Sequence, residues 1–139
     1  MSGLRWMLDT NAVSDLIRQP AGAIMQRIAA EPTGAVCTSI VVASELRFGA
    51  RRKGSAVLTE RVEQLLKVLP VLPFEAPADE HYADIRAALE RAGTPIGSHD
   101  LLIAAQARAL SLTLVTHNVR EFARVPGLTI QDWQAPSPG

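Results

Sequence analysis

Residues 5–11 read RWMLDTN, a short apolar stretch that ends on an acidic side chain and two further polar ones. Residues 5–8 have the length and apolar character of a buried strand that ends at Asp9. A helical pattern follows over residues 12–18 and stops near Pro20. This order predicts an α/β fold in which Asp9 lies at the carboxyl end of a buried strand.

The same alternation of short strands and longer helices continues along the chain. Further strands are expected at 35–38, 71–73, 112–116 and 128–130. Helices are expected at 21–31, from a Ser39 cap to 50, at 56–68, at 78–92 with Gly93 as C-cap, at 99–110 and at 120–123. Prolines flank 71–73, which indicates an edge strand. The pattern predicts one domain over 1–134, a three-layer α/β/α fold with a central, mostly parallel sheet, and a disordered tail at 135–139.

Composition and charge restrict the function classes. The chain has 139 residues, which suits one domain, and its formal net charge is zero, which argues against coating nucleic acid by bulk attraction. No apolar stretch is long enough to span a membrane, and the N-terminus does not resemble a secretion signal. The single cysteine, Cys37, is expected to be a buried thiol. We therefore expect a cytoplasmic protein with no membrane association.

Several polar residues are expected at one edge of the sheet. Asp9 follows the first strand, and Asn118 and Glu121 follow the strand at 112–116. The helix at 99–110 precedes that strand, so its N-terminus, with Asp100, should lie at the same edge. Because sites in open parallel sheets form beyond the carboxyl ends of the strands, these residues are candidates for one functional site.

Glu45 is the acidic residue that is hardest to place in an ordinary core. Helical spacing puts it on one face with Val41 and Phe48. A carboxylate on an apolar face costs several kcal/mol when it has no partner. Glu45 lies roughly 9 Å down its helix from Ser39, from which its side chain can reach back toward a site at the helix start.

Each of these residues also has a purely structural interpretation. Asp9 can cap the following helix, Asp100 suits a first helical turn, and Glu45 can pair with an arginine. Asn118 suits a turn, and Glu121 can be solvated. The structural interpretations lose force together, because the fold pattern directs the whole set to one edge. A cluster of carboxylates from separate elements suits a hard divalent cation such as Mg²⁺, which can activate water for attack on a phosphodiester.

Other charged groups are weaker candidates. Arg47, Arg51, Arg52 and Lys53 form a dense basic patch that can bind RNA or an acidic partner, or can simply be solvated. Residues 79–84 hold Asp79, Glu80, His81 and Asp84, and we interpret them as the first turns of a helix rather than as a metal cluster. His99 and His117 adjoin the expected site in surface or supporting positions. Trp6 and Trp133 are expected to serve packing or dimer contacts.

Four stretches resemble the motifs of the PIN-domain family, and specifically the VapC toxins of bacterial toxin–antitoxin pairs. They are MLDTN at 7–11, ASEL at 43–46, PIGSHDLLIAA at 95–105, and LVTHNVREF at 114–122 with VPGL at 125–128. They occur in the family's order over nearly the whole chain. Many family members have Asp where this chain has Asn118.

The resemblance implies a Mg²⁺- or Mn²⁺-dependent endoribonuclease in which Asp9, Glu45 and Asp100 are the core acids and metal ligands. Asn118 or Glu121 would supply the fourth contact. We also assign Asn11, Thr116, Arg47, Arg51 and Arg52 to substrate binding. The closing motif is similar to that of VapC toxins that cut transfer RNA. The family further implies a homodimer and a VapB-like antitoxin whose C-terminal segment fills the active-site groove.

Two alternatives remain open at this point. An Asp-nucleophile phosphatase uses a second Asp two residues after the first, where this chain has Asn11. A non-catalytic RNA- or protein-binding module on the same fold is the other alternative, although such a module has no need of Glu45 on an apolar face.

Overall fold

The computed structural model describes residues 3–134, so the tail predicted at 135–139 lies outside the described residues. The strands are β1 (Trp6–Leu8), β2 (Val36–Ser39), β3 (Val71–Leu72), β4 (Thr113–Val115) and β5 (Ile130–Gln131). The helices are α1 (Thr10–Arg18), α2 (Ala23–Ala30), α3 (Ile40–Lys53), α4 (Ala56–Val68), α5 (Ala78–Arg91), α6 (Ser98–Ala109) and α7 (Val119–Phe122). Every predicted element is present, with ends that differ by one to two residues in most cases.

The five strands form one sheet in the order β3-β2-β1-β4-β5. All four strand pairs are parallel, and β1 is central: Met7 pairs with Cys37 on one side and with Leu114 on the other. This confirms the predicted α/β class and makes the described sheet parallel throughout. The short strand β3 lies at the edge, as its flanking prolines predict.

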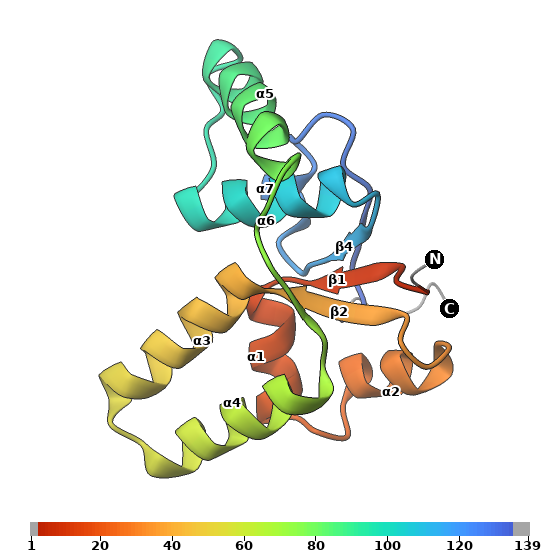
Figure 1. Cartoon of the computed structure of the whole chain (residues 1–139), viewed down its shortest axis with the longest axis vertical. Coiled ribbons are helices and arrows are strands. Elements are labelled where there is room, and N and C mark those ends of the chain that lie inside the picture. The colour runs from red at the N-terminus through yellow and green to blue at the C-terminus, as the bar shows by residue number, and fades with distance from the viewer. Residues whose placement is uncertain (1–2, 135–139) are drawn as a thin grey trace.

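Helices cover both faces of the sheet. Figure 1 shows α5 and α6 on one side of the strands, and α1, α2 and α4 on the other. All residues of β1 and β2 are buried, as expected for parallel strands between two helical layers. Burial also raises the pKa of the Cys37 thiol to about 12, so Cys37 is the inert core residue that was expected.

Two helix starts follow from polar caps beside the strands. The Ser39 hydroxyl accepts a hydrogen bond from the Val41 amide at 2.9 Å, which confirms Ser39 as the cap of α3. The first helix begins at Thr10 rather than Ala12, because Asp9 itself caps it. Gln106, buried on α6, donates to the carbonyls of Leu72 and Pro73 at 3.0 and 2.9 Å. These bonds fix α6 against the edge of the sheet.

The two tryptophans pack against each other within the chain. The rings of Trp6 and Trp133 meet edge to face with centroids 5.3 Å apart, and the Arg27 guanidinium lies 4.8 Å from the Trp133 ring centre. This contact confirms the packing role expected for these residues and attaches the end of the described chain to α2. Among residues 3–134, no helix has both the length and the apolar character needed to cross a bilayer.

Candidate active site

Asp9 stands at the carboxyl end of the central strand and is only 3% exposed. Its Oδ1 accepts a hydrogen bond from the Ala12 amide at 2.8 Å, so Asp9 does cap α1. Burial raises the pKa of Asp9 even though hydrogen bonds from the Thr116 hydroxyl and the Ala12 amide oppose the change. The negative charges of Glu45 and Asp132 raise it further. A buried carboxylate therefore combines a structural contact with an unfavourable charge environment.

Glu45 approaches Asp9 from α3. Thr10 donates its hydroxyl proton to Glu45 Oε1 at 2.7 Å, and His99 Nδ1 lies 3.3 Å from Glu45 Oε2. The predicted apolar face is wrong: Phe48 is 62% exposed and the Glu45 side chain is half-buried. Glu45 is thus held at a polar edge by neighbours from α1 and α6.

Asp100 and Glu121 form a hydrogen-bonded carboxyl pair. Burial, the bond to Glu121 and the charges of Glu121, Asp9 and Glu45 together raise the pKa of Asp100 to about 7. Burial also acts to raise the pKa of Glu121, but hydrogen bonds from Asp100, the Gly97 amide and Asn118 outweigh it and lower that pKa. One proton shared by two acids is the usual result of like charges held close together.

Asn118 and Thr116 support these acids. The Asn118 amide donates to Glu121 Oε2 at 2.7 Å, and the Asn118 backbone N–H donates to the Thr116 hydroxyl at 2.9 Å. The Gly97 N–H donates to the other oxygen of Glu121 at 3.2 Å. Asn118 and Glu121 are therefore hydrogen-bonded to each other beside Asp100.

The structure brings five predicted residues to one edge of the sheet, namely Asp9, Glu45, Asp100, Asn118 and Glu121. Asn11 is exposed on the first turn of α1, next to this edge. Within residues 3–134, no three acidic, histidine or cysteine side chains are already grouped as a metal site. The carboxylates lie close to one another, but their oxygens do not converge on a common position.

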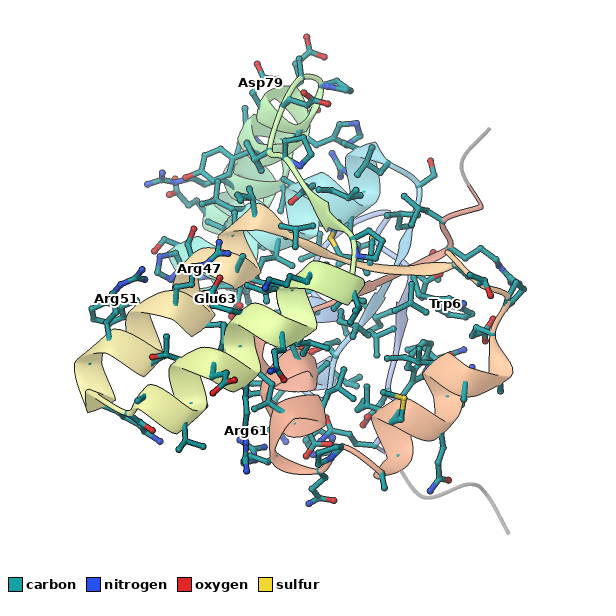
Figure 2. All side chains as sticks on the ribbon, turned by 60° about the horizontal axis from the view of Figure 1, so that its bottom comes forward. Trp6, Arg47, Arg51, Arg61, Glu63 and Asp79 are labelled. Atoms are coloured by element: carbon teal, nitrogen blue, oxygen red, sulfur yellow. The ribbon has the colours of Figure 1, made fainter. Side chains whose placement is uncertain are left out.

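The predicted basic patch on α3 is divided. Arg47 donates through Nε and Nη2 to the two carboxylate oxygens of Glu63 on α4, both at 2.9 Å, so it joins the two helices (Figure 2). Arg51 and Arg52 are exposed, and the Arg52 guanidinium lies 5.9 Å from the Phe48 ring centre. Arg51, Arg52 and the equally exposed Lys53 are thus the part of the patch that forms an open basic surface.

The acidic stretch at the start of α5 contacts α6. Arg108 of α6 donates from Nε to His81 Nδ1 at 2.8 Å and lies 4.0 Å from Asp84. Asp79 and Glu80 are exposed in the first turn of α5, where the helix dipole favours acids. His117, the other histidine near the site, lies 3.0 Å from Asp132.

Three supporting residues were missed by sequence reasoning. Thr10 holds Glu45, Gly97 holds Glu121, and the charge of Arg124 lowers the pKa of Glu121. Thr10 directly follows Asp9 and Gly97 lies in the loop before Asp100, so closeness to a predicted acid was the available signal. Arg124 carried no such signal, because its position depends on how the α7 turn packs.

Comparison with known proteins assigns the chain to a family. The PIN domain model matches residues 6–128. The chain therefore belongs to the PIN domain family.

Within this family, its relatives are VapC proteins. It is 38% identical over 134 residues to the tRNA(fMet)-specific endonuclease VapC of Salmonella typhimurium, covering 94% of this chain and 98% of the relative. It is 35% identical to ribonuclease VapC2 of Haemophilus influenzae over the same shares. The crystal structure of VapBC2 from Rickettsia felis, bound to a DNA fragment from its promoter, contains a chain with a TM-score of 0.88 at 30% identity, covering 94% of this chain and 99% of that one. The chain is thus a PIN domain of the VapC toxin type.

Proposed function

We propose that this chain is a Mg²⁺- or Mn²⁺-dependent endoribonuclease that acts as the toxin of a type II toxin–antitoxin pair. The observation that carries the proposal is the cluster of Asp9, Glu45, Asp100 and Glu121 at the carboxyl ends of β1 and β4. In the described part of the chain, none of these acids forms an ion pair with lysine or arginine. Relatives over nearly the full length are named as ribonucleases.

The donor set fits a hard divalent cation. Burial and the neighbouring acids raise the pKa of Asp100 to about 7, so the ionised form of this carboxyl is disfavoured without a cation. Mg²⁺ binds carboxylate oxygens, keeps several waters and usually needs only one or two carboxylates, so a closed cage is not required. Asp9, Glu45 and Asp100 are the residues that we expect to hold it.

The chain's own side chains would fix the geometry of the reaction. Asp9 is oriented by the Ala12 amide and Thr116, Glu45 by Thr10, and Glu121 by Gly97 and Asn118. Such bonds hold the carboxylates in place before the substrate arrives, so little reorganisation is needed. A bound Mg²⁺ would lower the pKa of a water and stabilise charge on the phosphodiester oxygens.

We propose transfer RNA as the substrate class. Relatives of Salmonella typhimurium and Shigella flexneri, 38% and 37% identical, are named tRNA(fMet)-specific endonucleases. We likewise propose a cytoplasmic site of action, because that is where a tRNA substrate is available.

We further propose that the chain forms homodimers and is inhibited by a VapB-like antitoxin. Its structural relatives include toxin–antitoxin complexes from Rickettsia felis, Salmonella typhimurium and Haemophilus influenzae. An open groove of about 450 Å³ between α1, α2 and α4 has apolar walls that include Leu16, Ile17, Met25, Leu65 and Val68. A groove of this kind suits the apolar face of an antitoxin helix.

The proposal is tested by incubating purified chain with a panel of tRNAs in Mg²⁺, in Mn²⁺ and in EDTA. We expect cleavage in either metal, no cleavage in EDTA, and strong loss of cleavage in Asp9→Asn and Asp100→Asn. Asparagine at position 9 also caps helices well, so Asp9→Asn tests the charge rather than the cap. Cleavage by both variants at the wild-type rate would contradict the mechanism. A wild type that binds RNA but does not cleave it would indicate a non-catalytic binding module.

A further inference from the structure

A hollow of about 270 Å³ opens directly beside the acidic cluster. Gly97, Asn118, Arg120, Glu121 and Arg124 line it, so it shares Gly97, Asn118 and Glu121 with the site described above. A Cβ at position 97 would stand 3.7 Å from Asp100 Oδ2 and 4.0 Å from Glu121 Oε1. Gly97 therefore lies within van der Waals distance of both acids, and the hollow that it lines adjoins them directly.

Two arginines give this hollow positive charge, in contrast to the acids beside it. Arg120 and Arg124 are four residues apart and both are exposed. Within residues 3–134, neither has a carboxylate within ion-pair distance, whereas Arg47 has both of its donating groups committed to Glu63. Arg124 Nη1 donates weakly, at 3.4 Å, to the Pro95 carbonyl, which directs its guanidinium along the rim of the hollow.

Glu121, the acid inside the hollow, is already engaged. Its two oxygens accept from the Gly97 N–H and the Asn118 amide, and it shares a proton with Asp100. The charge of Arg124 also acts on Glu121, but this single carboxylate faces two guanidinium groups, so positive charge exceeds negative charge among the residues that line the hollow. Guanidinium groups in this situation bind phosphate oxygens, often through two parallel hydrogen bonds.

We propose that Arg120 and Arg124 bind a backbone phosphate of the RNA strand adjacent to the phosphodiester that is cleaved. The inference rests on the proposed function. An RNA strand that places one phosphate at the acids meets repulsion there, and a chain of zero net charge offers no general attraction to offset it. A phosphate held in the neighbouring hollow supplies local attraction and fixes the register of the strand without reading its sequence.

The experiment measures RNA binding separately from cleavage. All proteins carry Asp9→Asn so that RNA stays intact, and a short fluorescein-labelled single-stranded RNA is titrated in Mg²⁺ at several salt concentrations. We expect Arg120→Gln/Arg124→Gln to weaken binding by at least about tenfold at low salt. The slope of log K against log salt should fall in magnitude by roughly 0.7, because the two arginines together neutralise one phosphate.

The matched control removes two arginines elsewhere. Arg5 precedes β1 at the end opposite Asp9, and Arg61 is exposed on α4 (Figure 2). Arg5→Gln/Arg61→Gln changes the net charge equally and should leave both the affinity and the slope near those of the parent. Arg120→Lys/Arg124→Lys should recover most of the slope but only part of the affinity, since lysine keeps the charge and loses the paired geometry. Thermal melting of every variant verifies that it is folded.

The proposal is overturned if the Arg120/Arg124 double variant binds RNA with the same slope and affinity as the control. It is equally overturned if that variant loses only the antitoxin, because the hollow then serves a protein partner. Cleavage by the chain without Asp9→Asn is assayed in parallel. A failure to cut RNA in that assay counts against the proposed function, whereas unchanged binding counts against the hollow alone.

Discussion

The chain contains two groups of acidic side chains, and they differ in almost every physical respect. Asp79, Glu80 and Asp84 are close in sequence and exposed on α5, and Figure 2 shows Asp79 at the tip of this helix. The second group comes from four separate stretches and is buried or half-buried; its members are Asp9, Glu45, Asp100 and Glu121. Burial, and then the charges of neighbouring acids in the group, raise the pKa of Asp9 and Asp100. Solvated acids with little desolvation penalty are typical of the first turn of a helix. Acids whose burial is unfavourable are typical of a functional site.

The largest expected effect is on catalysis. Asp9→Asn and Asp100→Asn should each reduce kcat/KM for RNA cleavage by at least about a hundredfold, because both remove a carboxylate from the cluster. Asp79→Asn and Asp84→Asn remove the same charge on α5 and should remain within about twofold of wild type. Comparable losses of kcat/KM in the two pairs of variants would contradict the proposal that only the buried group of acids takes part in cleavage.

The next effect is on metal-dependent stability. At about pH 8, a hundredfold excess of Mg²⁺ over its Kd should stabilise the chain by about 2.7 kcal/mol, seen as a rise in Tm. Asp100→Asn should lose most of this rise, whereas Asp79→Asn should keep it. Differential scanning calorimetry with Mg²⁺ and with EDTA measures the difference, and a rise that survives Asp100→Asn but not Asp79→Asn would place the cation on α5.

A smaller effect concerns pH in the absence of metal. The pKa of Asp100 rises from 3.8 to about 7 on folding, so the folded state holds a proton that the unfolded chain releases. This contribution to stability is present at low pH and is lost as the pH rises through about 7. Between about pH 5 and about pH 8, we expect the free energy of unfolding in EDTA to fall by roughly 1–2 kcal/mol, after allowance for solvent screening.

Urea denaturation of Asp100→Asn provides the comparison for this pH effect. Asparagine does not titrate, so its pH dependence over this interval should be flatter. Glu121 acts in the opposite sense only below its usual pKa of 4.5, because its pKa is lowered. A wild type that becomes more stable between about pH 5 and about pH 8 would contradict the assigned direction.

The smallest effect concerns the α5 group itself. His81→Ala removes the acceptor of the Arg108 Nε–H and should lower the free energy of unfolding by about 1 kcal/mol. Cleavage should be unchanged, because this contact joins α5 to α6 away from the acids. A large loss of cleavage in a stably folded His81→Ala would show that α5 contributes to the site after all.

Sequence periodicity and strand-end logic were sufficient for the fold and for the edge at which Asp9, Asp100 and Asn118 lie. Each of these depends on local order along the chain, which a sequence carries. The environment of Glu45 was predicted wrongly, because helical spacing showed which residues share its face but not whether another element covers that face. Phe48 is in fact exposed.

Long-range side-chain pairing was the part that sequence could not supply. Arg47 and Glu63 are sixteen positions apart on two helices, and only the packing angle of α3 against α4 brings them together. The same holds for Gln106 and the carbonyls of Leu72 and Pro73, and for Arg124 beside Glu121. Such contacts depend on tertiary geometry, about which local residue patterns carry almost no information.

The Trp6–Trp133 pair has a spectroscopic consequence. The chain's two tryptophans form a single locus with Arg27, whereas its one tyrosine, Tyr82, lies on α5 in the opposite helical layer. Tryptophan emission therefore reports on the packing of β1 and the segment ending at residue 134 against α2, and tyrosine emission reports on α5. Following both signals during denaturation separates loss of one layer from loss of the other, with no label added to the protein.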